Sequence, residues 1–330
     1  MMLRTEIMPF PRQDEIAPEE DGVGFALRMA TANGLSFREL ALHLASPGHL
    51  YLPAHASDTV AFMFGCTPSR LKNAFVVRQS HRGTQTADFL GHRFLRPYHL
   101  RQGSPQVCPA CLAEDRVARA IWSVCLVTSC PLHGNRLLDR CQCGRPTRWR
   151  RPALDICECG RSLTAADQRV TRADPRELAV SGQVASLLEP ACNQISPHLA
   201  KLLPCGLEGL SVDTFLRVFW ILGIVGPGQS RDHPRCANRC LPTAEAADVV
   251  CRAFDRLVPV IANRPSKEPL RVPMPALQAL YDECTSTADV RFIGSLISRL
   301  QKRFPSPQLH RLACIDPQLS LFGVADEPYL

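Results

Sequence analysis

Four short segments between residues 108 and 159 carry paired metal-binding side chains: Cys108-Pro-Ala-Cys111, Cys130-Pro-Leu-His133, Cys141-Gln-Cys143 and Cys157-Glu-Cys159. Four cysteine or histidine ligands complete one tetrahedral zinc site, so these eight residues are enough for two sites. Chain order predicts one site made of Cys108, Cys111, Cys130 and His133, and a second made of Cys141, Cys143, Cys157 and Cys159. Glycines follow three of the pairs, at positions where a positive φ angle would let a tight turn close: Gly134, Gly144 and Gly160.

A disulfide framework is the competing interpretation of these cysteines. No secretory signal is visible, and 16 cysteines in 330 residues are too sparse for a disulfide scaffold. Zinc is therefore favoured. Both predicted sites have four protein ligands and leave no position open for water, so two structural Zn²⁺ ions are predicted. A zinc deaminase would need His-x-Glu ahead of its Pro-Cys-x-x-Cys segment, and no such pair precedes Cys108.

Length and composition set further bounds. A chain of 330 residues predicts two or three folded units. The formal charge of +7 is moderately basic, which suggests a polyanionic partner. The longest apolar run, Val218–Val225, is far shorter than the roughly 20 residues that a membrane span requires. We therefore expect a soluble protein of a reducing compartment, with no membrane partner.

The sequence predicts a mainly α-helical fold that is divided into the following segments. A proline-rich extended arm (1–20) precedes a helix-turn-helix-like N-terminal unit (21–100). A central double zinc ribbon with short β elements (101–172) is followed by a helical C-terminal unit (173–304) and an irregular tail (305–330).

Capping signals define the N-terminal helices. A first helix is predicted from Asp21 or Gly22 to Asn33-Gly34, and Ser36-Phe-Arg-Glu39 is a capping box for the next. Two short helices then follow, one ending at Gly65 and one beginning at Thr67-Pro68 and reaching about Val77. The pair resembles a helix-turn-helix whose second helix presents Ser69, Arg70, Lys72 and Asn73, although a plain helical hairpin has the same pattern.

Two basic regions are candidate contact surfaces. The first, His81–Arg101, mixes histidines and arginines, Arg93 and Arg96 among them, with aromatic residues; a solvated linker has the same composition. The second, Arg136–Arg172, holds nine arginines and four acidic residues. Arginines fixed on zinc-bound turns would lose little entropy on binding nucleic acid or a nucleoprotein, although an acidic protein surface would also fit. The residues predicted to contact nucleic acid or a partner are Arg70, Lys72, Arg93, Arg96, Arg145, Arg148, Trp149, Arg150 and Arg151.

The rest of the chain is predicted to be mainly helical. Leu112–Cys125 is predicted as one helix between the first two zinc pairs. Asp174-Pro175 opens another helix, Ser211 caps an apolar helix over Val212–Val225, and Thr243 caps a long helix to about Val260. Two more are predicted over roughly 275–284 and 289–304. The pair Cys236-x3-Cys240 has no convincing partner pair and is interpreted as two free thiols.

The zinc-ligand region resembles the TniQ/TnsD family of transposon target-selection proteins. The resemblance rests on Cys108-Pro-Ala-Cys111-Leu-Ala-Glu114-Asp115, Trp122, Cys130-Pro-Leu-His133-Gly134, Leu137-Leu138-Asp139 and the Cys-x-Cys-Gly segments at 141–144 and 157–160. Upstream, Phe25-Ala-Leu-Arg28-Met-Ala-Thr-Ala-Asn33-Gly34-Leu35 looks like the opening helix of the family. Residues 20–165 carry the resemblance.

The resemblance implies an adaptor and not an enzyme. Members of the family link a target, either DNA directly or a CRISPR RNA-guided complex, to an AAA+ ATPase that recruits the transposase. Some act as dimers, so a homodimer is implied as well, and the implied location is the bacterial cytoplasm. This chain departs from the family in having Cys-x-Cys where Cys-Pro-x-Cys is frequent, and in carrying the extra thiol Cys125. It is too short for the long additional DNA-binding region of the largest members.

Two other functions fit parts of the pattern. A zinc-ribbon or helix-turn-helix transcription regulator would protect a palindromic operator and would not associate with an ATPase. A nuclease or other metalloenzyme would need an open metal position and metal-dependent turnover. The sequence favours the target-selection adaptor over both.

Overall fold

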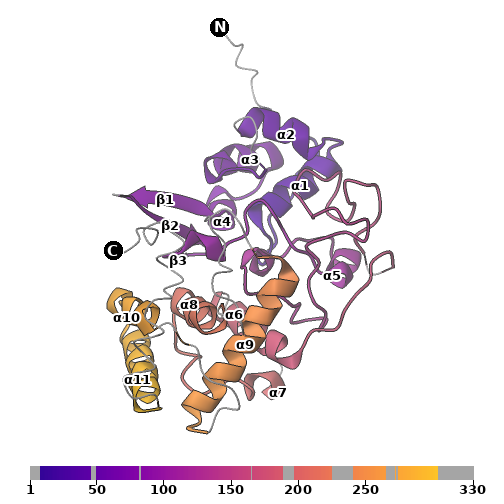
Figure 1. Cartoon of the computed structure of the whole chain (residues 1–330). Coiled ribbons are helices and arrows are strands. Elements are labelled where there is room, and N and C mark those ends of the chain that lie inside the picture. Colours follow the sequence, from indigo (N-terminus) through magenta and orange to yellow (C-terminus); the bar gives the residue numbers. More distant parts are fainter. Residues whose placement is uncertain are drawn as a thin grey trace, which may run out of the picture. The chain divides into compact units, whose positions relative to one another are not determined.

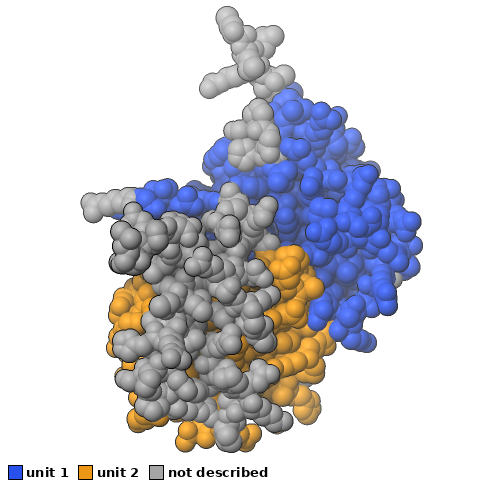
Figure 2. All heavy atoms as spheres, in the orientation of Figure 1, with its two compact units in different colours: residues 1–125, 133–172 blue, residues 126–132, 173–330 orange. Residues whose placement is uncertain are grey.

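The computed structural model describes residues 8–45, 50–81, 83–164, 166–188, 197–224, 241–264, 272 and 274–303. The chain divides into two compact units, which Figure 2 colours separately. Unit 1 comprises residues 1–125 and 133–172, and unit 2 comprises residues 126–132 and 173–330. Helices dominate the described residues, and one small sheet lies in unit 1 (Figure 1), so the predicted mainly α-helical class is confirmed.

Unit 1 consists of short elements. Its α-helices are α1 (Gly22–Ala32), α2 (Phe37–Leu44), α3 (Ser57–Phe64), α4 (Pro68–Asn73) and α5 (Pro109–Glu114). Its 3₁₀ helices are η1 (Ala54–Ala56), η2 (Pro97–His99) and η3 (Ala120–Ser123), and its strands are β1 (Val77–His81), β2 (Thr84–Phe89) and β3 (His92–Phe94).

Asp21 begins α1, as the sequence predicted. Its carboxylate accepts hydrogen bonds from the backbone N–H groups of Val23 (2.9 Å) and Gly24 (3.1 Å) and from the hydroxyl of Ser123 (2.7 Å). The side chain is buried, and desolvation raises its pKa to about 6. Asp21 therefore caps α1 and also joins it to a residue about a hundred positions later in the sequence.

The described part of the predicted arm, residues 8–20, contacts the C-terminal end of α3. The backbone N–H of Phe10 donates to Met63 (2.8 Å), and that of Asp14 donates to Phe64 (3.0 Å). Arg28 of α1 holds the same segment through Asp14 and the fully buried Glu20, each at 2.7 Å. The segment is therefore a strap attached by both backbone and charge.

Helices α3 and α4 occupy the region predicted as a helix-turn-helix. Gly65, in the left-handed conformation, ends α3 as predicted. Thr67 does not cap α4 with its side chain, because its hydroxyl and N–H bond to Glu15 of the strap (3.0 and 3.1 Å). Helix α4 ends at Asn73, four residues short of the predicted end.

The prediction missed a sheet that follows α4 directly. Strands β1, β2 and β3 form an antiparallel sheet in that order, with Val77 opposite Asp88 and Ala87 opposite Phe94. Alternate residues of a strand face opposite sides, and Ala87, Phe89 and Phe94 are buried on one of them. The hairpin residues from Arg78 to Gln85 that the structure describes are exposed. β-Structure therefore occupies part of His81–Arg101, the region predicted as a candidate contact surface with a solvated linker as the alternative.

The single helix predicted over Leu112–Cys125 is wrong. Helix α5 ends at Glu114, and Arg116 has a φ angle of 53°, which an α-helix cannot contain. A 3₁₀ turn, η3, then buries Ile121 and Trp122. The apolar spacing of this segment reflects burial in an irregular loop.

The regular elements in the described part of unit 2 are all helices. Its helices are α6 (Pro175–Leu188), α7 (Pro197–Ala200), α8 (Val212–Gly223), α9 (Thr243–Ile261), α10 (Met274–Glu283) and α11 (Thr287–Arg303). All 12 residues of α8 are buried, and Ser211 caps this helix as predicted. Gly223 brings α8 against α9, because a Cβ atom there would lie 2.1 Å from the carbonyl oxygen of Val249.

Buried charge in unit 2 is neutralised locally. Arg217 of α8 is 1 % exposed and forms ion pairs with Asp213 and Glu283. At the end of α8, Arg252 donates to the carbonyl of Gly223 (2.8 Å) and Arg256 to that of Leu222 (2.6 Å). These bonds satisfy carbonyl groups that a helix end leaves without intrahelical partners.

Several predictions fall outside the described residues, among them Cys236-x3-Cys240 and the tail 305–330. Among the residues that are described, no helix has both the length and the apolar composition of a membrane span.

Replacing Asp21 tests the junction between α1 and Ser123. Asp21→Ala removes the acceptor of three hydrogen bonds and should lower the free energy of unfolding by about 1–3 kcal/mol. Asp21→Asn keeps an acceptor oxygen and should lower the free energy of unfolding by less than Asp21→Ala does. Urea unfolding of the zinc-replete chain measures both values.

The wild type and Asp21→Asn also allow a test of the pH dependence of stability. Because folding raises the pKa of Asp21 to about 6, the folded chain binds this proton more tightly than the unfolded chain. The wild type should therefore lose stability relative to Asp21→Asn as pH rises from about 4 to about 6. A difference between the two proteins that is constant over this range would contradict the burial of an ionisable Asp21.

Candidate metal centres

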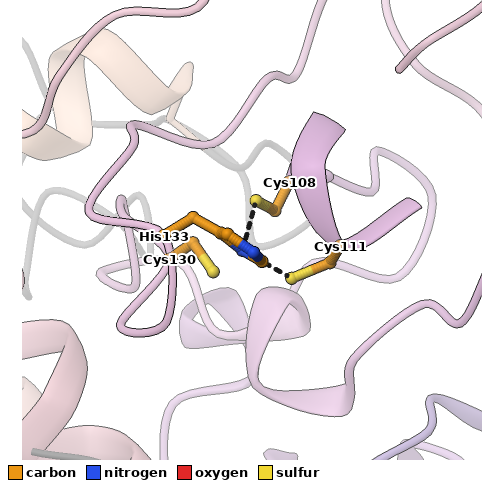
Figure 3. A group of neighbouring side chains, drawn as sticks. All are labelled: Cys108, Cys111, Cys130 and His133. Atoms are coloured by element: carbon orange, nitrogen blue, oxygen red, sulfur yellow. Dashed lines mark hydrogen bonds between the residues drawn. The ribbon is translucent and has the colours of Figure 1, made fainter. Parts of the chain in front are cut away.

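The first cluster gathers Cys108, Cys111, Cys130 and His133, whose ligand atoms all lie within 4.8 Å of one another. The four side chains converge on one point (Figure 3). His133 Nδ1 lies 3.6 Å from the Sγ of Cys108 and 3.2 Å from the Sγ of Cys111. Ordinary zinc–sulfur and zinc–nitrogen bond lengths place tetrahedral S and N ligands about 3.6 Å apart. The residues therefore fit a tetrahedral Zn²⁺.

Helix α5 positions two of these ligands. Cys108 is its N-cap residue and Cys111 lies one turn later. The carbonyl of Cys108 accepts from Leu112 (3.1 Å) and that of Cys111 accepts from Asp115 (2.9 Å). Just before the helix, Val107 and Leu138 exchange both backbone hydrogen bonds (2.9 and 2.8 Å).

The second cluster gathers Cys141, Cys143, Cys157 and Cys159 under the same 4.8 Å limit. Sulfur atoms are 3.8 Å apart between Cys141 and Cys159, and 3.9 Å apart between Cys143 and Cys157. Two thiolates on one tetrahedral zinc are about 3.8 Å apart, whereas disulfide sulfurs are about 2.0 Å apart. These distances fit a shared metal and not a disulfide.

Two turns of the same design build the second cluster. In Cys141-Gln-Cys143-Gly144-Arg145, the N–H of Cys141 donates to Arg145 (2.9 Å) and the N–H of Gly144 donates back to Cys141 (2.8 Å). The turn from Cys157 to Arg161 repeats both bonds at 2.8 Å. Gly144 and Gly160 both have φ = 85°, and Gly134 has φ = 65°, so the predicted positive angles are confirmed.

Backbone donors and burial act differently on the thiols of the second cluster. The backbone N–H of Arg161 lowers the pKa of Cys159 to about 7. Burial raises the pKa of Cys157 to about 12. A metal that holds all four cysteines as thiolates must therefore displace protons, above all the proton of Cys157.

Sequence reasoning missed two polar side chains that contact the clusters. Gln168, which is 7 % exposed, accepts from the N–H of Gln142 (2.9 Å) and donates to the carbonyl of Ser162 (2.6 Å), so it bridges the two turns. Its amide also donates to the sulfur of Cys141 (3.6 Å). Glu114 lies against His133, with its carboxylate oxygens 3.0 Å from the ring Nε2. The position of Glu114 three residues after Cys111 was the available signal, because such spacing shares a helix face.

The predicted contact residues divide by exposure. Arg96 is half-buried, Trp149 and Arg151 are buried, and the exposed members are Arg70, Lys72, Arg93, Arg145, Arg148 and Arg150. Arg70 lies 3.8 Å from Glu15 and Arg93 lies 3.2 Å from Asp88, so each of these arginines faces a carboxylate.

Trp149 and Arg151 hold the loop that carries the exposed arginines. The indole N–H of Trp149 donates to the carbonyl of Gln102 (2.8 Å). The guanidinium of Arg151 donates to the carbonyls of Leu154 (3.1 Å) and Arg148 (2.9 Å) and lies over the indole ring. Burial lowers its pKa to about 10, so it stays charged at neutral pH. In this structure both side chains are directed inward.

Metal analysis tests the two clusters. The zinc-replete chain should carry two zinc ions, measured by native mass spectrometry. Cys108→Ser should remove one ion and expose the α5 region to proteolysis, because zinc binding at such sites contributes folding free energy. Cys205→Ser changes an exposed cysteine that belongs to neither cluster, and should leave both ions in place. A well-folded chain without metal would contradict a structural role.

Replacing Arg151 tests whether its role is internal. Arg151→Lys should lower the free energy of unfolding by about 1–3 kcal/mol, because a lysine cannot reproduce the fixed pair of hydrogen bonds to the carbonyls of Leu154 and Arg148. The matched control, Arg148→Lys at an exposed site, should change stability by less than about 0.5 kcal/mol. If urea unfolding shows the same small change in the free energy of unfolding for both variants, the hydrogen bonds of the buried Arg151 do not stabilise the fold.

Part of the chain matches a known protein family. Residues 11–137 match the model of the TniQ family. This range contains helices α1 to α5, the sheet and all four residues of the first cluster. No curated protein sequence matches the chain. The family match supports a target-selection role associated with transposition. Residues 11–137 are therefore a TniQ domain, and the resemblance to the TniQ/TnsD family is confirmed.

Proposed function

We propose that this chain is a non-enzymatic adaptor for transposition target selection, acting in the bacterial cytoplasm. It links a target to an AAA+ transposition ATPase, and it reaches that target on DNA directly or through a CRISPR RNA-guided complex. The observation that carries the proposal is the TniQ match over residues 11–137, together with a complete first metal cluster inside that range. Both clusters have four protein ligands, which suits structural zinc.

The proposed polyanion contact centres on Arg145, Arg148 and Arg150, which are exposed. Backbone bonds support this choice. The carbonyl of Arg145 accepts from Cys141, and the carbonyl of Arg148 accepts from the guanidinium of Arg151. Positions fixed before binding lose little conformational entropy on contact with phosphate. We call these three residues the arginine loop.

A second proposed contact lies on α4 and the sheet. Helices α3 and α4, joined by a turn of three residues, have the order of a helix-turn-helix, and the exposed Arg70 and Lys72 lie on the second helix. Arg93 lies on β3. Arg70 and Arg93 each face a carboxylate, which a bound phosphate would have to displace.

DNA binding across a salt series tests the proposed polyanion contact. The zinc-replete chain should bind a random-sequence duplex with an affinity that falls steeply with salt, because each phosphate that the protein neutralises releases counterions. Replacing the three residues of the arginine loop by alanine should reduce the slope of log K against log salt by about 0.9 for each phosphate that is no longer neutralised. Fluorescence anisotropy with a labelled duplex measures both the affinity and the slope.

The control removes the same charge from exposed positions of unit 2: Lys201, Arg291 and Lys302, each replaced by alanine. This triple variant should leave the slope unchanged. Equal effects of the two triple variants would mean that net charge alone drives binding. Absence of binding at low salt would assign the arginine loop to a protein partner.

Association with an AAA+ transposition ATPase tests the adaptor itself. Co-elution with the ATPase in the presence of ATP and DNA is the expected result in size-exclusion chromatography, and the elution volume of the chain alone reports whether it forms a homodimer. Protection of a palindromic operator without ATPase association would favour the transcription regulator instead.

A further inference from the structure

We infer that Glu114 is a positioning residue for the first metal cluster: its carboxylate fixes the ring of His133 so that Nδ1 is the metal-binding nitrogen. Glu114 is not one of the eight predicted metal ligands. The inference concerns the zinc proposed for the first cluster and does not depend on DNA or on any protein partner.

The geometry around His133 separates its two ring nitrogens. Nδ1 faces the sulfurs of Cys108 (3.6 Å) and Cys111 (3.2 Å). Nε2 faces the opposite way, with both oxygens of Glu114 at 3.0 Å. A neutral imidazole carries one N–H group, and a carboxylate can only accept. The N–H therefore lies on Nε2, which leaves the lone pair of Nδ1 directed toward the cysteine sulfurs.

Short chain segments hold both partners of this contact. Glu114 is the last residue of α5, three positions after Cys111, so a ligand and the carboxylate share one face of the helix. On the other side, the guanidinium of Arg172 donates to the backbone carbonyl of His133 (2.8 Å). The imidazole is thus held at its backbone and at its ring.

The adjacent carboxylate has a different partner. Asp115 lies 3.0 Å from Arg119, and Arg119 also forms an ion pair with Glu19. Glu114 and Asp115 are neighbours of the same charge with separate contacts, so Asp115→Asn is a matched control. It removes the same charge one residue away from the His133 contact.

The chemistry gives the contact a defined effect. A carboxylate that accepts from the distal N–H of a metal-bound histidine fixes the tautomer and makes the other nitrogen a better donor. Loss of such a partner lowers metal affinity by about 10- to 100-fold. Because the side chain of Glu114 is 59 % exposed, we expect the lower end of this range for Glu114→Ala.

Zinc competition on the full chain tests the inference. Glu114→Ala should weaken one of the two zinc sites about tenfold against a chromophoric chelator. Glu114→Gln keeps an acceptor oxygen without the charge, and its zinc affinity should lie between those of Glu114→Ala and the wild type. Asp115→Asn should match the wild type. Cobalt(II) absorption identifies the affected site, because Cys₃His and Cys₄ environments give different visible spectra.

Histidine NMR provides a readout that general destabilisation would not change. In the zinc-bound wild type, His133 should show a proton on Nε2 and metal on Nδ1. Glu114→Ala should broaden or lose the Nε2 proton signal through exchange with water, while circular dichroism with excess zinc stays unchanged.

Three results would overturn the inference. The first is equal zinc affinity of Glu114→Ala and Asp115→Asn, and the second is metal on Nε2 in the wild type. Both leave zinc binding itself intact. The third, a wild-type chain that binds no zinc, would overturn the zinc proposal as well, and the competition assay separates these cases.

Discussion

Four donor atoms that must meet at one point constrain the middle of this chain more than any hydrogen-bonded element does. Among the described residues between 100 and 172, the regular structure amounts to α5, η3 and isolated β-bridges. Such elements are too short to be stable by themselves. Thiolates crowded within 4.8 Å repel one another unless a cation lies between them, so metal, turn geometry and fold depend on one another.

The Cys-x-Cys spacing that departs from the family pattern has a clear structural explanation. In each turn of the second cluster the first cysteine donates its N–H to an arginine carbonyl four residues later, and glycine closes the loop with a positive φ. Gln168 then joins the two turns through the backbone of each. A short spacer is sufficient because the following Gly-Arg segment supplies the rest of the turn.

How far the sequence could predict this protein depends on how local each signal is. The ligand pairs, the start of α1 at Asp21 or Gly22 and the apolar helix after Ser211 are set by neighbouring residues, and the structure contains each of them. The sheet after α4 was missed because only Ala87, Phe89 and Phe94 of its strand residues are buried, which hides the alternation. The helix predicted from Leu112 failed because Arg116 has a φ angle of 53°, which the apolar spacing of the segment does not reveal.

The segment Arg148-Trp149-Arg150-Arg151 illustrates the limit most directly. Composition alone treats its members as equivalent, yet in this turn Arg148 and Arg150 are exposed whereas Trp149 and Arg151 are buried. Which pair faces inward depends on distant acceptors such as the carbonyl of Gln102, and no local pattern records these. Because the buried arginine donates to the carbonyl of Arg148, the inward pair fixes the backbone on which the outward pair stands. The arginine that begins this loop, Arg145, is fixed by the Cys141 turn itself. Metal coordination and arginine placement are therefore one structural feature, and a change that loosens the second cluster would also disperse the charges proposed to contact a polyanion.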